Sequence, residues 1–211
     1  MKIFGTLTAA FGRQYEVRTD AGEILLCVPR GKKSLFACGD RVQIAVTGPG
    51  QGVIDKLLER TSLLYRSDAW RQKLIAANAT QVVLVVATEP SFSDEFLSRC
   101  ICAAESQHLK VLIVLNKIDI VAGLEGARAQ LATFAELGYP ILELSALDSA
   151  DALRARLIGE TSLLVGQSGM GKSTLTNALI PEARAETREI SEYLDTGKHT
   201  TTFARLYPLP E

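Results

Sequence analysis

Short runs of alternating apolar and polar residues fill the first sixty positions of the chain. These runs cover residues 3–10, 14–19, 23–28, 41–47 and 52–56, and turns that contain glycine separate them. A period of two places one face of a strand in a core and the other face in solvent. Five short strands of this kind predict a small β-barrel.

The pattern changes further along the chain, where unbroken apolar runs alternate with helical patterns. Apolar runs cover residues 81–87, 111–115, 140–144 and 162–165, as expected for parallel strands that are buried on both faces. Residues 94–107 have helical spacing, with apolar side chains at Phe96, Leu97, Cys100, Ile101 and Ala104. The alternation predicts a doubly wound α/β sheet. We expect a barrel at 1–60, a linker at 61–73 and an α/β domain at 74–211.

A phosphate-binding loop is predicted directly after the last apolar run. The pattern G-x-x-x-x-G-K-[ST] is met in full, and Thr174 follows it; the loop residues are Gly166, Gln167, Ser168, Gly169, Met170, Gly171, Lys172 and Ser173. Glycines let the backbone approach a phosphate, and the helix expected at 172–180 adds positive charge at its N-terminus. We expect Lys172 to bridge the β and γ phosphates and Ser173 to ligate Mg²⁺. The alternative is a glycine-rich structural turn, which the strand before it and the helix after it disfavour.

A guanine-reading motif is predicted where the apolar run at 111–115 ends. The residues are Asn116, Lys117, Ile118 and Asp119, and the carboxyl ends of strands are where open α/β sheets bind ligands. We expect the Asp119 carboxylate to accept N1–H and N2–H of guanine, Asn116 to brace N7, and the stem of Lys117 to pack on the base. The alternative is a polar turn between a strand and a helix.

A second polar segment follows the run at 140–144. Ser145 and Ala146 lie where a GTPase offers a backbone N–H to guanine O6. Both guanine motifs precede the phosphate loop, whereas an ordinary GTPase carries the Asn-Lys-x-Asp motif after it. The order indicates a circularly permuted GTPase and disfavours an ATP-dependent enzyme.

Together these motifs resemble those of the RsgA (YjeQ) family, the circularly permuted GTPases of small ribosomal subunit biogenesis. Further similar segments are Lys-Leu-Ile-Ala-Ala-Asn-Ala-Thr-Gln at 73–81, Ile-Ser-Glu at 190–192 and Gly-Lys-His-Thr-Thr-Thr at 197–202. The resemblance implies an OB-fold barrel, a GTPase domain, GTP and Mg²⁺ as cofactors, and a zinc domain whose site is absent from this sequence. It also implies the small (30S) ribosomal subunit and its 16S rRNA as partners.

The D-x-P-G motif that senses the γ-phosphate in the family is missing from these 211 residues. The chain ends at residues 206–211, where the family continues into the strand that carries this motif. We therefore expect hydrolysis by this chain alone to be slow or undetectable. The alternative to a GTPase is a non-catalytic or truncated module that binds nucleotide or RNA.

Residues 186–202 lie where a GTPase keeps its first switch, the loop that the γ-phosphate and Mg²⁺ order. One hydroxyl among Thr200, Thr201 and Thr202 is expected to reach the metal, and we assign Thr201. The resemblance implies that His199 places or activates the attacking water. The alternative is a loop histidine that contacts only rRNA or solvent.

The barrel region is more basic than the rest of the chain. Residues 1–60 contain nine Lys/Arg and six Asp/Glu, whereas the whole chain has a net charge of −1. Arg30, Lys32 and Lys33 fall in a loop between strands, where OB-folds commonly meet oligonucleotides. They are predicted to bind RNA; a solvated charged loop is the alternative.

Other composition features point to an ordinary cytoplasmic protein. Cys27, Cys38, Cys100 and Cys102 lack metal-ligand spacing and are interpreted as reduced core thiols. No apolar run reaches transmembrane length, and the N-terminus begins a strand rather than a signal peptide. We expect a monomer with no membrane partner.

Overall fold

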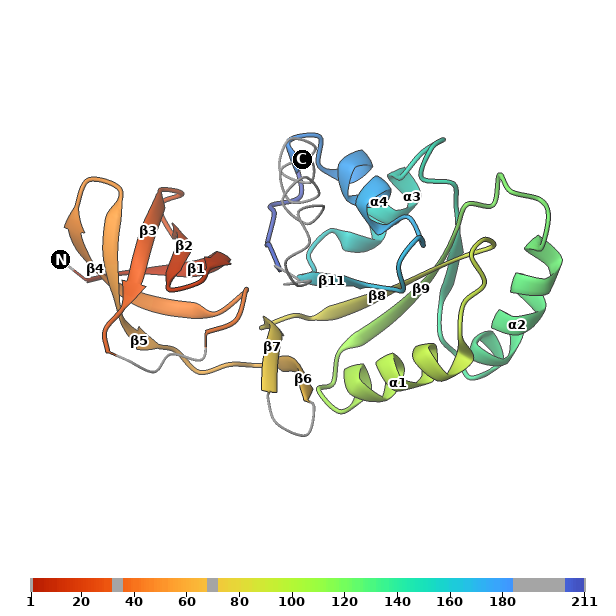
Figure 1. Ribbon diagram of the computed structural model, residues 1–211, viewed down its shortest axis with the longest axis horizontal. Coiled ribbons are helices and arrows are strands. Elements are labelled where there is room, and N and C mark those ends of the chain that lie inside the picture. Colours follow the sequence, from red (N-terminus) through yellow and green to blue (C-terminus); the bar gives the residue numbers. More distant parts are fainter. Residues whose placement is uncertain (1, 32–35, 68–71, 184–203, 211) are drawn as a thin grey trace. The chain divides into compact units, whose positions relative to one another are not determined.

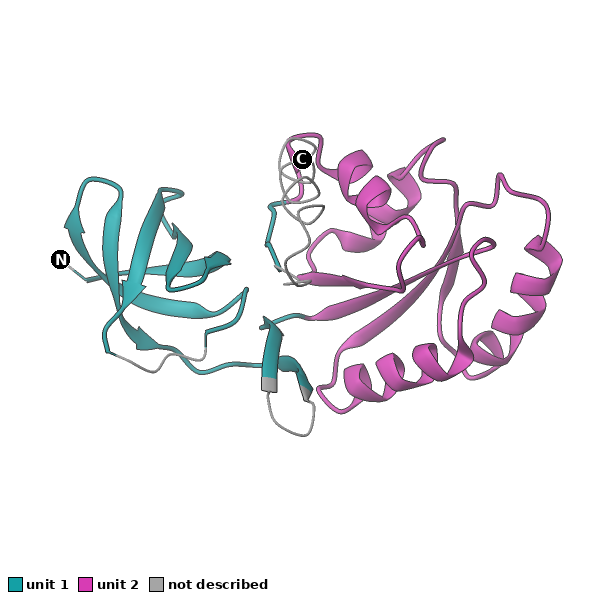
Figure 2. Ribbon diagram, in the orientation of Figure 1, with its two compact units in different colours: residues 1–79, 201–208 teal, residues 80–200, 209–211 magenta. Residues whose placement is uncertain are grey.

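The computed structural model describes residues 2–31, 36–67, 72–183 and 204–210. It divides the chain into two compact units, which Figure 2 shows in different colours. The first unit comprises residues 1–79 and 201–208, and the second comprises residues 80–200 and 209–211. Within the described ranges, no helix is long and apolar enough to cross a membrane.

The first unit contains the expected barrel of five strands (Figure 1). Its strands are β1 (Lys2–Phe11), β2 (Gln14–Thr19), β3 (Ile24–Pro29), β4 (Arg41–Gly48) and β5 (Gln51–Leu57). The order around the closed barrel is β1-β2-β3-β5-β4, with β4 pairing back onto β1. Only the β3–β5 pair is parallel. This is the Greek-key arrangement of an OB-fold.

The barrel core follows from the alternation in the sequence. Leu7, Val17, Cys27, Val42 and Ile44 are fully buried and pack together in one cluster. Burial raises the pKa of the Cys27 thiol to about 11, so this cysteine is a neutral core side chain.

The remaining cysteines follow the prediction only in part. Cys38 is buried and its pKa is raised to about 12, chiefly by desolvation. The prediction of a core thiol was wrong for Cys102, which is exposed, and Cys100 is only partly buried. Both lie on one amphipathic helix, where a shift of two residues turns the side chain from the buried face toward solvent.

The segment expected to be a linker forms a hairpin instead. Its strands are β6 (Leu63–Ser67) and β7 (Gln72–Ala77), which pair antiparallel. The hairpin joins the barrel unit through a bridge between Cys38 and Ala76 and a 2.8 Å hydrogen bond from the Ala77 N–H to the Cys38 carbonyl. The pairing within the hairpin is local, but the bonds that attach it to the barrel come from Cys38, which is distant in sequence.

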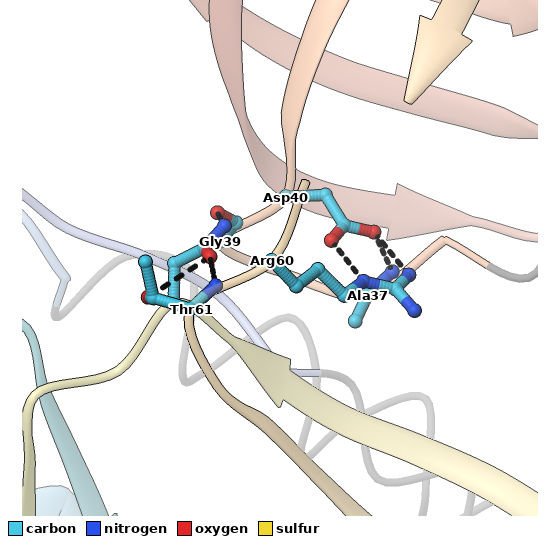
Figure 3. Close-up of polar contacts among 6 residues, drawn as sticks. Ala37, Gly39, Asp40, Arg60 and Thr61 are labelled. Atoms are coloured by element: carbon cyan, nitrogen blue, oxygen red, sulfur yellow. Dashed lines mark hydrogen bonds and ion pairs between the residues drawn. The ribbon is translucent and has the colours of Figure 1, made fainter. Parts of the chain in front are cut away.

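Polar contacts also involve the segments that flank the hairpin, residues 60–61 before β6 and Asn78 after β7 (Figure 3). The Arg60 guanidinium donates to both oxygens of the buried Asp40 carboxylate, at 2.6 and 2.7 Å. The Asn78 side chain accepts from the Thr61 N–H at 2.8 Å and donates to the Gly39 carbonyl at 2.9 Å. The barrel and the hairpin therefore form one packed unit.

A short segment near the end of the chain also belongs to the barrel unit. The Leu206 N–H donates to the Thr8 carbonyl at 2.8 Å, and Arg205 forms a bridge with Ala9. The Arg205 guanidinium lies 3.3 Å from the Glu16 carboxylate. Residues 205 and 206 thus pair with β1 of the barrel, and both belong to the first unit.

The second unit is a parallel sheet with helices on both faces (Figure 1). Along the chain its elements are β8 (Gln81–Ala87), α1 (Asp94–Glu105), β9 (Lys110–Asn116), α2 (Leu124–Glu136), β10 (Ile141–Glu143), α3 (Asp151–Leu157), β11 (Ser162–Val165) and α4 (Lys172–Leu179). The strand order is β10-β9-β8-β11, with α1 and α2 on one face and α3 and α4 on the other. Every residue of β8 is buried, as its unbroken apolar run predicts.

Parallel pairing places the carboxyl ends of all four strands at one edge of the sheet. The loops that follow β8, β9, β10 and β11 therefore meet there. Three of these four loops carry the motifs predicted to bind a nucleotide.

Candidate nucleotide-binding site

The predicted phosphate loop connects β11 to α4, and its conformation favours glycine at several positions. Gly169 and Gly171 have φ angles of +83° and +87°, the left-handed region that L side chains rarely adopt. A Cβ on Gly166 would lie closer than 3.0 Å to the Val85 carbonyl oxygen of β8. The loop is therefore a tight backbone turn that leads into the N-terminus of α4.

Lys172 is the first residue of α4, and its side chain folds back over the loop. The ammonium donates to the carbonyls of Gly166 and Gln167, both at 2.7 Å. Desolvation by burial lowers its pKa below the ordinary lysine value. A cation held at a glycine-bearing loop beside a helix N-terminus suits a polyanionic ligand.

Asn116 ends β9 and connects three of the predicted motifs. Its side chain is almost fully buried. The amide Nδ2 donates to the Met170 carbonyl in the phosphate loop at 3.0 Å, and Oδ1 accepts from the Ala146 N–H at 3.0 Å. The structure therefore brings together loops that are far apart in sequence. The Ala146 N–H, expected to face guanine O6, donates to Asn116 here.

The loop predicted to read guanine turns sharply after Asn116. Lys117 has a φ of +63°, and its carbonyl accepts from the Ile120 N–H at 2.9 Å. Asp119 lies inside this turn and is exposed, which leaves its carboxylate accessible to a ligand. The Ile118 N–H donates to the Leu144 carbonyl at 3.4 Å and links the turn to the loop after β10.

Ser145 lies at the centre of the same edge. Its side chain is 4% exposed, and its hydroxyl oxygen has no hydrogen-bond partner within the described part of the chain. A buried hydroxyl without a partner costs free energy, as polar groups at binding sites often do. Ser145 therefore remains a candidate for the guanine subsite.

The sequence prediction missed the loop after β8, which carries residues 88–93. The Thr88 hydroxyl donates to the Lys117 carbonyl at 3.1 Å, and the Glu89 carbonyl accepts from the Lys117 ammonium at 2.8 Å. The Ser93 N–H donates to Oε1 of Gln167 at 3.3 Å. This loop follows a buried strand, just as Asn116 does. The position at the end of a buried apolar run could therefore have identified it from the sequence.

Several predicted site residues lie outside the described residues: Lys32, Lys33, His199, Thr200, Thr201 and Thr202. Arg30 is described, and its guanidinium lies 2.8 Å from the Asp55 carboxylate, with most of its side chain exposed. Ser173 and Thr174 are exposed on the first turn of α4. In the described ranges, no group of three or more His, Cys, Asp or Glu residues could hold a metal ion.

Comparisons with known proteins agree with this architecture. A sequence-family model described as RsgA GTPase matches residues 57–211. The small ribosomal subunit biogenesis GTPase RsgA of Burkholderia pseudomallei is 53% identical over 212 residues, which cover 98% of this chain and 68% of that protein. The crystal structure of YjeQ from Thermotoga maritima matches with a TM-score of 0.70 and 31% identity, covering 86% of this chain and 66% of that chain.

A further solved structure, YloQ, is described as a circularly permuted GTPase and matches with a TM-score of 0.65 and 25% identity. The chain spans about two thirds of the length of these relatives. The observed barrel and parallel sheet, together with these matches, confirm the expected fold class: an OB-like barrel followed by a circularly permuted GTPase domain.

Proposed function

This chain belongs to the RsgA GTPase family, and from that premise we propose that it binds guanine nucleotides and hydrolyses GTP during late maturation of the small ribosomal subunit. The observation that supports this most strongly is the Asn116 side chain, which is hydrogen-bonded to both Met170 and Ala146. It joins the guanine loop to the phosphate loop, so one ligand with a purine base and phosphates could contact both.

Base recognition is assigned to the loops after β9 and β10. The exposed Asp119 carboxylate would accept N1–H and N2–H of guanine, a pair of donors that adenine lacks. Asn116 would brace N7 with its remaining amide hydrogen, and the stem of Lys117 would lie on the face of the base. Ser145 and Ala146 would border O6.

Phosphate recognition is assigned to the loop at 166–171 and to the first turn of α4. Its backbone N–H groups and the Lys172 ammonium would replace water around the phosphates. The structure fits this role because two left-handed glycines shape the loop and because the lysine folds over it.

Magnesium is proposed as the metal cofactor. Mg²⁺ keeps several waters and needs few protein ligands when phosphates supply the others. The exposed Ser173 hydroxyl follows Lys172 on α4 and fits this role, because a hydroxyl oxygen is a hard ligand. Thr201 is proposed as a second ligand. The bound metal would neutralise charge on the β and γ phosphates.

His199 is proposed to position the attacking water, and the small ribosomal subunit with its 16S rRNA is proposed as the partner. The barrel would contact RNA through Arg30, Lys32 and Lys33. Arg30 is paired with Asp55 but largely exposed, so a phosphate could still reach it. We place the chain in the cytoplasm and expect it to act as a monomer.

Calorimetry with GDP, GTP, ADP and ATP tests nucleotide binding. We expect guanine nucleotides to bind at least ~100-fold more tightly than adenine nucleotides. Equal affinities for the two bases would overturn the proposed specificity.

Turnover of GTP with and without 30S subunits then tests catalysis. In a chain extended through the D-x-P-G region that the family carries, subunit-stimulated hydrolysis that is lost in His199→Ala, with GTP affinity retained, would support the enzymatic role. Tight GTP binding without turnover in that extended chain would instead favour a non-catalytic nucleotide- or RNA-binding module.

Replacing Arg30, Lys32 and Lys33 with alanine tests the RNA contact. Binding to 30S subunits should weaken and its salt dependence should flatten, by roughly 0.7 to 0.9 in slope per lost phosphate contact. Calorimetric affinity for GDP serves as the control and should not change. An unaltered salt slope would assign the RNA contact to another surface.

A further inference from the structure

We propose that Thr88 is a positioning residue for guanine recognition, acting through the backbone of Lys117. The inference rests on the proposed guanine-nucleotide site and adds a residue from the loop after β8, which none of the predicted motifs contains. Its basis is the hydrogen bond of 3.1 Å from the Thr88 hydroxyl to the Lys117 carbonyl.

Lys117 is held in a backbone conformation that it would not adopt freely. Its φ of +63° lies in the left-handed region, which is unfavourable for a residue with a Cβ. Such a conformation persists when surrounding contacts fix it. Thr88 is 7% exposed, so water has little access to replace its hydroxyl.

The Lys117 carbonyl also fixes the turn that presents Asp119. It accepts the Ile120 N–H at 2.9 Å as well as the Thr88 hydroxyl. Asp119 lies between the two ends of this hydrogen-bonded turn. A shift of the carbonyl would therefore move the carboxylate assigned to guanine.

Glu89, the next residue of the loop after β8, binds the ammonium end of Lys117. The Lys117 ammonium donates to the Glu89 carbonyl at 2.8 Å. Lys117 is thus bonded at its backbone carbonyl and at its ammonium, and its aliphatic stem is fixed between these two points. The Lys117 Cε lies 3.8 Å from the position that a Cβ on Gly171 would occupy, so the stem passes beside the phosphate loop.

The loop after β8 reaches the phosphate loop at two further points. The Ser93 N–H donates to Gln167 Oε1 at 3.3 Å, and a Cβ on Gly169 would lie 3.2 Å from the Pro90 ring. Residues 88–93 thus contact both the base-reading loop and the phosphate loop. Within this loop, the Thr88 side chain hydrogen-bonds to the base-reading turn.

The test compares Thr88→Val, which removes the hydroxyl at nearly constant shape, with Thr88→Ser, which retains it. Affinities for GDP and for inosine diphosphate, whose base lacks the N2 amino group, are measured by calorimetry. We expect Thr88→Val to weaken GDP binding roughly tenfold and to reduce the preference for GDP over inosine diphosphate. Thr88→Ser should restore both quantities.

The preference between the two nucleotides is the decisive readout, because general destabilisation would weaken both equally. Thr133→Val on the exposed face of α2 is the matched control and should change neither affinity. If the valine variant does not fold, Thr88→Ala carries the same test, since it also lacks the hydroxyl.

An unchanged preference in Thr88→Val or Thr88→Ala, or a failure of Thr88→Ser to restore it, would overturn the role of Thr88. A wild-type chain that does not distinguish GDP from ADP would overturn the proposed function, and the inference with it. The two failures are therefore separable.

Discussion

The side-chain amide of Asn116 donates a hydrogen bond of 3.0 Å to the backbone carbonyl of Met170. It joins the end of β9 to the loop after β11, and both groups lie in a buried environment. Because Oδ1 of the same amide accepts from Ala146, one side chain fixes the relative positions of three loops.

Asn116→Ala should therefore weaken GDP binding by at least about tenfold and lower the free energy of unfolding by about 1–3 kcal/mol, because the buried Met170 carbonyl and the partly buried Ala146 N–H lose this partner. Asn116→Asp is the informative companion, since it keeps the acceptor for Ala146 but places an oxygen against the Met170 carbonyl. Calorimetry and urea unfolding measure both effects. Wild-type GDP affinity in both variants would show that Asn116 does not organise the site.

Gly171→Ala should abolish nucleotide binding. Its φ of +87° is unfavourable for alanine, and the new Cβ would lie closer than 3.0 Å to the Asn116 amide nitrogen. Gly126→Ala in α2 is the matched control, because nothing lies within 4 Å of its Cβ position. That control should gain about 0.5–1 kcal/mol of stability through its helix propensity. GDP binding that survives in Gly171→Ala would contradict the close packing described for this loop.

Asp119→Asn should shift the base preference from guanine toward xanthine. Xanthine carries an oxygen in place of the N2 amino group, so an amide donor would match it where a carboxylate does not. The measurement is competition between GDP and xanthosine diphosphate, and Glu136→Gln, exposed at the end of α2, controls for loss of charge. Retention of the guanine preference in Asp119→Asn would remove this carboxylate from base recognition.

Arg60→Met should destabilise the barrel unit by about 3–5 kcal/mol. The Asp40 side chain is 0% exposed, and removal of Arg60 would leave that carboxylate buried without its ion pair. Arg41→Met breaks the pair with the 56% exposed Asp20 and should cost about 1 kcal/mol or less. Urea unfolding of both variants gives the comparison, and equal losses would show that burial does not set the strength of these pairs.

Glu143 should contribute stability that depends on pH. Hydrogen bonds from Arg128, at 2.7 to 3.2 Å, lower the pKa of the Glu143 carboxyl in the folded chain. A lowered folded-state pKa gives stability that is fully present above the unfolded pKa and is lost as the pH falls through the folded value.

Glu143→Gln should therefore unfold at lower urea than wild type at about pH 7 and approach the wild-type midpoint at about pH 3. Glu136→Gln again serves as the control, because this exposed side chain should leave the pH profile unchanged. A constant difference between Glu143→Gln and wild type across this range would contradict the assigned ion pair.

The sequence by itself determined the features that depend on neighbouring residues. Alternation with a period of two specified β1 to β5, and the unbroken apolar runs specified β8 and β9. Glycine spacing predicted a tight turn after β11, and the turn has left-handed φ angles at Gly169 and Gly171, a conformation that favours glycine. These patterns are local, so they can be interpreted without knowledge of the rest of the chain.

Only the tertiary structure decided which of these segments meet. The hairpin of β6 and β7 joins the barrel unit because the Ala77 N–H bonds to the distant Cys38 carbonyl. The bonds from Asn116 to Met170 and from Thr88 to Lys117 connect residues 54 and 29 positions apart. No local pattern encodes these last two bonds, because the order of parallel strands in the sheet brings their loops together at one edge.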